Sequence, residues 1–193
     1  MDQLRDFERN IELLIGRPTN LRPFVCDGSP FDCKMFIVGL NPASLMKASF
    51  WDFWHPGAGF DKRAWFEAYK AERMNRPLKP GRTRRSPISN SRRVIEWIIT
   101  SLGSVRALET NIYSAATEAY RDLEQRQRLT APFDFLLDAI KPAVIVVHGS
   151  DAVSHIVQKE LSVPIIEVSH FSRGWSRQAA TDLGLRVRAI LGK

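Results

Sequence analysis

Short apolar runs alternate with amphipathic stretches along this chain. The runs lie at 35–38, 143–147 and 164–168, and residues 106–113 are compatible with a further strand. Between and around them, apolar side chains recur at helical spacing, which predicts helices over 2–15, 61–74, 131–140, 151–160 and at the C-terminus. Uninterrupted apolar strands that alternate with helices are typical of parallel sheets covered on both faces. The pattern therefore predicts an α/β fold, a three-layer α/β/α sandwich around a four-stranded parallel sheet.

Turn-forming residues mark the segments between these elements. An aromatic-rich loop follows the first strand over 41–59. The segment 75–86 combines basic residues with proline and glycine, which predicts an irregular, mobile loop. Ser86 followed by Pro87 is a typical helix start, and we expect that helix to end at Gly103.

Composition places the chain among ordinary globular proteins. It has 193 residues, of which 44% are hydrophobic and 25% charged. These proportions exclude intrinsic disorder, a collagen-like chain and a disulfide scaffold as descriptions of the whole sequence. Neither an internal repeat nor an interdomain linker occurs. We therefore expect residues 1–193 to form a single domain into which the basic loop 75–86 is inserted.

Charge is distributed unevenly. The 28 basic and 21 acidic residues give a formal net charge of +7. Between Glu72 and Glu96 there is no acidic residue, but there are eight basic ones: Arg73, Arg76, Lys79, Arg82, Arg84, Arg85, Arg92 and Arg93. Without these eight, 20 basic residues nearly balance the 21 acidic ones. A basic segment in a near-neutral domain indicates a localised contact with a polyanion such as nucleic acid; a solvated loop that is basic for solubility is the alternative.

Several classes of function are excluded by missing motifs. The sequence has no phosphate-binding GxGxxG or GxxxxGK[ST] pattern and no GxSxG nucleophile elbow, so we expect no nucleotide cofactor. Cys26 and Cys33 are too few for an iron–sulfur or four-cysteine zinc site, and the four histidines lack metal-ligand spacing, so we expect no metal. An apolar signal core and a membrane-length apolar run are also absent, which predicts a cytoplasmic protein with no membrane contact.

Polar residues follow each predicted strand. They are Asn41 to Ser44 after the first strand, Thr110 and Asn111 in the second, His148 to Asp151 after the third, and Ser169 to Ser172 after the fourth. Because ligands of open parallel sheets bind at the carboxyl ends of the strands, these residues are expected to form one site.

The strand-end residues resemble the motifs of the uracil-DNA glycosylase superfamily, in the same order. The matching segments are Gly39-Leu40-Asn41-Pro42-Ala43, Thr110-Asn111, Val146 to Ala152, and the histidine-bearing Ser169-His170-Phe171-Ser172. The resemblance extends from about Met35 to Trp175. It implies a uracil-DNA glycosylase-like fold and a monofunctional DNA glycosylase, which extrudes a base from DNA, hydrolyses its N-glycosidic bond and leaves an abasic site.

The resemblance also implies roles for individual residues. Asn41 and His170 would be catalytic: Asn41 would position the attacking water, and His170 would bind the O2 atom of the departing uracil. Asn111 would read the edge of the base and Phe53 would stack on it. The remaining substrate-binding positions would be Gly39, Leu40, Pro42, Ala43 and Ser172. Each side chain also has a plainer interpretation, as a turn, a loop cap, a buried amide or an aromatic core residue.

The expected DNA contacts lie in two loops: the basic loop, which is expected from its charge and has no obvious counterpart in the family, and the loop after His170, which the resemblance indicates. Phosphates would be bound by the basic loop through Arg76, Lys79, Arg82, Arg84 and Arg85. The loop after His170 would enter the duplex with Arg173 or Trp175 as the wedge that fills the gap left by the extruded base.

Departures from the family pattern leave other interpretations open. Ala43 replaces glycine in the first motif, and Phe171 replaces proline in the second, so the preferred base is undetermined. We expect a monomeric enzyme that acts on uracil or a related deaminated base in DNA. One alternative is a catalytically silent protein on the same fold that recognises damaged or abasic DNA. A small-molecule hydrolase or nucleotide-binding protein with an incidental basic loop is a more distant one.

Overall fold

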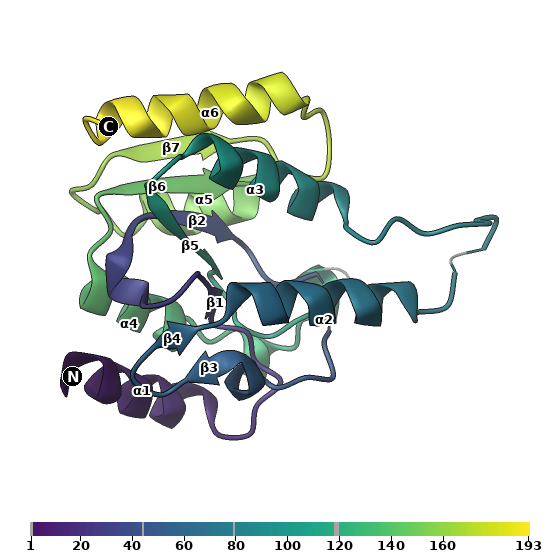
Figure 1. Cartoon of the computed structure of the whole chain (residues 1–193), viewed down its shortest axis with the longest axis horizontal. Coiled ribbons are helices and arrows are strands. Elements are labelled where there is room, and N and C mark those ends of the chain that lie inside the picture. The colour runs from purple at the N-terminus through teal and green to yellow at the C-terminus, as the bar shows by residue number, and fades with distance from the viewer. Residues whose placement is uncertain (1, 44, 79, 118–119) are drawn as a thin grey trace.

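The computed structural model describes residues 2–43, 45–78, 80–117 and 120–193 and has an α/β architecture (Figure 1). Its main sheet has five strands in the order β1-β5-β2-β6-β7. Their bounds are Phe24–Val25 (β1), Cys33–Gly39 (β2), Arg106–Asn111 (β5), Val144–His148 (β6) and Ile165–Val168 (β7). The pairs β2–β5, β2–β6 and β6–β7 are parallel, whereas β1 pairs with β5 in the antiparallel direction.

The four predicted strands are confirmed, but the prediction of a four-stranded, wholly parallel sheet is wrong. The fifth strand, β1, has two residues, Phe24 and Val25, which pair with Thr110 and Glu109 of β5. Thr110 Oγ1 donates a hydrogen bond to the carbonyl of Pro23 at 2.7 Å, which holds the start of β1 against β5. Because two residues cannot show a period, this strand left no signal in the apolar pattern.

Helices flank both faces of the sheet, as the apolar pattern predicted. On β2, Met35 and Ile37 face one hydrophobic cluster, whereas Phe36 and Val38 face another. Helices α3 (Asn90–Ser101) and α6 (Arg177–Ile190) pack on the first face. Helices α1 (Asp2–Ile15), α4 (Ala131–Ile140) and α5 (Ser150–Val157) contribute to the cluster on the second face. This alternation follows from the two-residue period of a strand.

The aromatic-rich loop folds into short elements that cover the second face. A 3₁₀ helix (Phe50–Phe53) leads into the hairpin β3 (Trp54–His55) and β4 (Gly59–Phe60), followed by α2 (Lys62–Met74). Asp61 begins α2, since its carboxylate accepts a hydrogen bond from the backbone N–H of Ala64 at 2.8 Å. Further 3₁₀ turns occur at Pro30–Asp32, Tyr120–Asp122 and Gln125–Gln127.

Helix α3 begins later than predicted. Ser86 does not cap it; Ser89 does, with extended backbone and a side-chain oxygen that accepts from the N–H of Arg92 at 3.1 Å. Pro87 therefore belongs to the preceding connection rather than to the first turn. The serine whose hydroxyl reaches a free helix N–H decides the start, and Ser89 has that geometry.

The connection between α2 and α3 contains the basic segment and projects from the body of the molecule (Figure 1). It projects on the side toward which β2 and β7 point, which is the side of the carboxyl ends of the parallel strands. Its described residues form turns and bends without a helix or strand, as predicted. Among the helices that the structure describes, none is long and apolar enough to cross a membrane.

Candidate active site

The carboxyl ends of β2, β5 and β6 and the segment after β7 open into one cavity of about 580 Å³. Six of the predicted site residues line it: Asn41, Pro42, Ala43, Asn111, His170 and Ser172. They come from the ends of three strands, β2, β5 and β7, that are far apart in the sequence, and the parallel sheet brings those ends to the same edge. Two other predicted residues support the site without lining it: Gly39 ends β2, and the carbonyl of Leu40 accepts from Tyr113 N at 2.9 Å.

The amide of Asn41 is oriented by its neighbours. Its Nδ2 donates to Thr117 Oγ1 at 2.8 Å and lies 3.4 Å from the carbonyl oxygen of Pro42 and 3.5 Å from that of Thr117. The two carbonyl oxygens can only accept, so Nδ2 is the amide atom that faces them. Within the described residues no donor is bonded to the other amide atom, Oδ1. Asn41 therefore keeps a hydrogen-bond acceptor for a ligand in the cavity.

Gly39 allows two site residues to approach each other. A Cβ at this position would lie 2.7 Å from Asn111 Oδ1 and 3.0 Å from His148 Nε2. The first distance is shorter than a real Cβ contact and the second is tighter than most, so glycine leaves room for this arrangement without displacing either side chain. In the parallel register Gly39 is paired with Asn111 on the neighbouring strand. The last residues of three adjacent strands, β2, β5 and β6, thus meet at one point.

His170 has a defined tautomer. The backbone N–H of Ser172 donates to His170 Nδ1 at 3.2 Å, and the Ser172 hydroxyl oxygen is 2.7 Å from the same nitrogen. A nitrogen that accepts from an N–H carries a lone pair, so the neutral ring has its proton on Nε2. Partial burial, followed by the charge of Arg173, lowers the pKa of His170. The side chain is therefore a neutral Nε2–H donor at the rim of the cavity near pH 7.

His148, the last residue of β6, is the second histidine of the site. Its ring stacks on Phe171 with centroids 4.2 Å apart and meets His170 edge-on with centroids 5.0 Å apart. Burial, and secondarily His170, lowers its pKa from 6.5 to about 3. Both imidazoles are consequently uncharged at neutral pH, and the end of the cavity formed by Asn111, His148 and His170 carries hydrogen-bonding groups without net charge.

A buried ion cluster lies beside the cavity, and two of its members, Glu109 and Arg92, line it. Glu109 on β5 contacts Lys62 Nζ at 3.0 Å and the Arg92 guanidinium at 2.5 Å, and Glu96 joins the same two cations. Burial alone would raise the pKa of Glu109, but the charges of Arg92 and Lys62 outweigh burial and lower the pKa. Glu109 is therefore ionised and neutralised by its partners. The cluster fixes the start of α3 against β5, next to Asn111.

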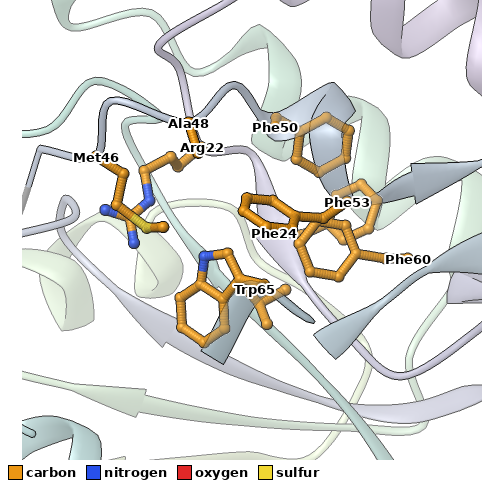
Figure 2. A pocket seen from close by; sticks show the side chains of 9 residues that line it. Arg22, Phe24, Met46, Ala48, Phe50, Phe53, Phe60 and Trp65 are labelled. Carbon is orange, nitrogen blue, oxygen red and sulfur yellow. The ribbon is translucent and has the colours of Figure 1, made fainter. Parts of the chain in front are cut away.

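The aromatic cluster is core rather than cavity wall. Phe53 is 7% exposed and lies among Phe24, Phe50 and Phe60 (Figure 2). The void that these rings share is about 10 Å³, which is close to the space of one water molecule. Phe53 does not line the larger cavity, so the structure does not bring it together with Asn41 and His170. Phe24 and Trp65 line both spaces, so the aromatic core borders the strand-end site through these two rings.

The arginines of the basic segment fall into two groups. Arg76 donates to the carbonyl of Leu45, and Arg85 donates to the carbonyl of Pro77. Arg82 and Arg84 are exposed, and neither makes a hydrogen bond or ion pair with another described residue. Lys79 lies outside the described residues. Arg76 ties the segment to the loop that carries Asn41, Arg85 bonds within the segment itself, and the second group is available to a polyanion.

The two wedge candidates also differ in their contacts. Trp175 folds back on Phe171 in an edge-on contact at 5.1 Å, and its indole N–H donates to the carbonyl of Ser169 at 3.3 Å. Arg173 is exposed beside His170, and its charge contributes to the lowered pKa of that histidine. Trp175 therefore supports the loop that positions His170, whereas Arg173 remains accessible.

Two residues that line the cavity, Glu109 and Arg92, were not assigned to the site from the sequence; His148 was expected there as a strand-end residue but was given no role. A carboxylate inside an otherwise apolar strand was a detectable signal for Glu109. In the part of the chain that the structure describes, no three histidine, cysteine or acidic side chains are grouped as a metal ion would need. The sequence matches no known protein-family model, and it matches no curated protein.

Proposed function

We propose that the protein is a monofunctional DNA glycosylase that removes uracil or a related deaminated base. The observation that carries the proposal is the convergence of Asn41, Asn111 and His170 on one cavity. These are the residues to which the resemblance to uracil-DNA glycosylases assigns the water, the base edge and the departing base. Their grouping supports the assignment because they lie at positions 41, 111 and 170 and meet only through the fold.

The free atoms of the site suit a dissociative hydrolysis. The C1′–N bond breaks first and its electron pair goes to the base, where negative charge develops on O2. The Nε2–H of His170 donates to this oxygen, and one preorganised donor of this kind contributes about 10²–10³ in rate. A water held by Asn41 Oδ1 then adds to the positively charged sugar carbon and loses a proton to bulk water. An amide is not a base, but this route needs only a placed water.

Two further features of the cavity fit this reaction. Lysine is absent from the described residues that line it, so no amine is available to form a Schiff base and cleave the strand. Ala43 is small, and the cavity of about 580 Å³ has room for a purine as well as a pyrimidine. We therefore expect hydrolysis without strand cleavage and a base preference that extends beyond uracil.

The basic segment supplies the expected DNA contact. Arg76 ties it to the loop after β2, so the exposed Arg82 and Arg84 are carried on the same structure as Asn41 and Ala43. Phosphates bound by these arginines would hold the strand next to the cavity and oppose the cost of extruding the base.

The experiment is incubation of the protein with oligonucleotides that each contain one uracil, thymine, hypoxanthine or xanthine, followed by alkali. We expect alkali-labile sites with uracil or another deaminated base, and an intact strand before alkali. Tight binding without alkali-labile product on every substrate would overturn the enzyme and favour a silent DNA-binding protein. Absence of both binding and product would also overturn the proposal that DNA is the partner.

A further inference from the structure

His148, the last residue of β6, makes no hydrogen bond with the described residues through either of its ring nitrogens. His148 is 8% exposed, yet it lines the cavity. Its Nδ1 is fully enclosed and has no hydrogen-bond partner among the described residues. A buried N–H without an acceptor is rarer and costlier than a buried lone pair, so the neutral ring carries its proton on Nε2. The only polar hydrogen of this imidazole therefore lies on the edge that faces Gly39 and Asn111.

This N–H lies beside an acceptor. The site that a Cβ of Gly39 would occupy is 3.0 Å from His148 Nε2 and 2.7 Å from Asn111 Oδ1. The two atoms thus lie on either side of the same small space above Gly39, and no hydrogen bond joins them. A donor and an acceptor side by side, both directed at the cavity, form a recognition pair for a ligand edge with the complementary order.

Deaminated bases have that order and their amino parents have the reverse. Uracil and hypoxanthine present a carbonyl oxygen next to a ring N–H, which is a lactam edge. Cytosine and adenine present an amino group next to a ring nitrogen with a lone pair. A lactam edge makes two hydrogen bonds with the His148 donor and the Asn111 acceptor. In an amino-bearing base, the amino group would face the His148 N–H, and the ring lone pair would face Asn111 Oδ1, so neither hydrogen bond forms.

We propose that His148 is a base-reading residue, which together with Asn111 recognises the lactam edge of a deaminated base. The proposal rests on the proposed function for its substrate class and adds a residue and a selection rule to it. His148 donates Nε2–H to the carbonyl oxygen next to the ring N–H, and Asn111 Oδ1 accepts from that N–H. Phe171 fixes the ring plane from behind, through the stacked contact at 4.2 Å.

The test uses full-length protein and three variants. His148→Phe keeps a ring that can stack on Phe171 but has no nitrogen. His148→Gln restores an N–H donor near the position of Nε2. His155→Phe is the matched control, because His155 lies on α5 outside the cavity, 2.8 Å from the hydroxyl of Tyr113. Near-ultraviolet circular dichroism checks that each variant is folded.

The first readout is single-turnover excision of uracil from an oligonucleotide. We expect His148→Phe to be about 100-fold slower, as for the loss of one preorganised donor, while His148→Gln recovers most of the rate. His155→Phe should match the wild type. Excision by His148→Phe at the wild-type rate would overturn the assignment of His148 and leave the proposed function standing.

The second readout does not depend on turnover. Free uracil and free cytosine are titrated into protein with ¹⁵N-labelled histidine, and binding is followed by nuclear magnetic resonance. We expect the wild type and His148→Gln to prefer uracil by about tenfold or more, and His148→Phe to lose the preference. If the wild type excises no base from any oligonucleotide, the proposed function fails and this titration decides the inference. Equal preference in the wild type and His148→Phe, or no binding of either base, would overturn it.

Discussion

At the scale of single residues, the site is defined by which atoms are already bonded. Asn41 has Nδ2 bound to Thr117, and His170 has Nδ1 bound to Ser172, so each side chain directs one remaining polar atom to the cavity. Neither arrangement can be inferred from residue type, because asparagine and histidine both have two polar ends. The sequence motifs identify the side chains, and the neighbouring backbone decides which atom of each reaches a ligand.

The first prediction concerns Gly39. Replacement by alanine would place a methyl group 2.7 Å from Asn111 Oδ1 and 3.0 Å from His148 Nε2, so the Asn111 amide must move away and His148 must shift by a few tenths of an ångström. Displacement of a catalytic group by about 1 Å can cost 10²-fold in rate, and we expect excision to fall by about that factor. Overpacking should also destabilise the protein by about 1–3 kcal/mol. Single-turnover assays and urea unfolding check the two effects, and an unchanged excision rate would contradict the arrangement.

The second prediction concerns pH and His148. Its pKa falls from 6.5 in the unfolded chain to about 3 in the folded one, because the buried ring resists protonation next to His170. Between these pH values the unfolded state binds the extra proton. The stability contribution is therefore complete above pH 6.5 and is lost as pH falls toward 3. The slope from one such group is at most about 1.4 kcal/mol per pH unit.

Urea unfolding of the wild type and His148→Phe between pH 7 and pH 4 measures this contribution. As the pH falls, the free energy of unfolding of the wild type should decrease more steeply than that of His148→Phe. Parallel pH profiles would show that His148 titrates normally in the folded protein.

At the scale of elements, α3 connects the basic segment to the sheet. Its first turn carries Arg92, which pairs with Glu109 of β5, and the connection that precedes it carries the exposed Arg82 and Arg84. The start of this helix therefore decides where the basic segment meets the cavity. The boundary is set by a single hydroxyl, that of Ser89, rather than by the Ser86–Pro87 pair that the sequence favours.

A pair of serine variants tests this boundary. Ser89→Ala removes the hydrogen bond to the N–H of Arg92 and should lower the free energy of unfolding by about 1 kcal/mol. Ser86→Ala removes an exposed contact with Arg93 at 3.3 Å and should change it by less than about 0.5 kcal/mol. Chemical denaturation of the two variants measures both values. A larger loss in Ser86→Ala would place the helix start at Ser86 after all.

The basic segment itself is tested by salt dependence. Arg82→Ala combined with Arg84→Ala should weaken DNA binding and reduce the slope of log affinity against log salt by about 2, one for each lost phosphate contact. The control is Arg5→Ala with Arg186→Ala, which removes two exposed charges on α1 and α6. Titrations of a labelled duplex at several salt concentrations compare the two. Equal slopes in both double variants would show that net charge, and not this segment, governs binding.

At the scale of the whole molecule, the core was predictable and the site was predictable in part. Val144 to Val147 form an uninterrupted apolar run, and a strand buried on both faces needs such a run whatever its neighbours are. The strand order then gathers Asn41, Asn111 and His170 without further information. The antiparallel strand β1 was not predicted, because a segment of two residues shows no period. Its pairing depends on the free edge of β5.

The unpredicted parts depend on contacts between distant segments. Phe53 was expected to stack on a base because of its spacing from His55, but the loop that carries it folds onto the sheet and buries it among Phe24, Phe50 and Phe60. Glu109 and Arg92 neutralise each other's charge, but no sequence pattern indicates that these two residues form a pair. His148 is one of four histidines, and its value as a donor depends on the enclosed Nδ1 and on the glycine opposite.

We propose that the strand-end cavity catalyses hydrolysis of the bond between a deaminated base and its sugar. Its most direct test is the release of free uracil from a uracil-containing duplex, measured in a single turnover with excess protein. We expect release by the wild type and rates at least about 100-fold lower for Asn41→Ala and His170→Ala, with affinity for an abasic duplex retained. Rates in either variant equal to the wild type, or no free uracil from the wild type, would contradict it.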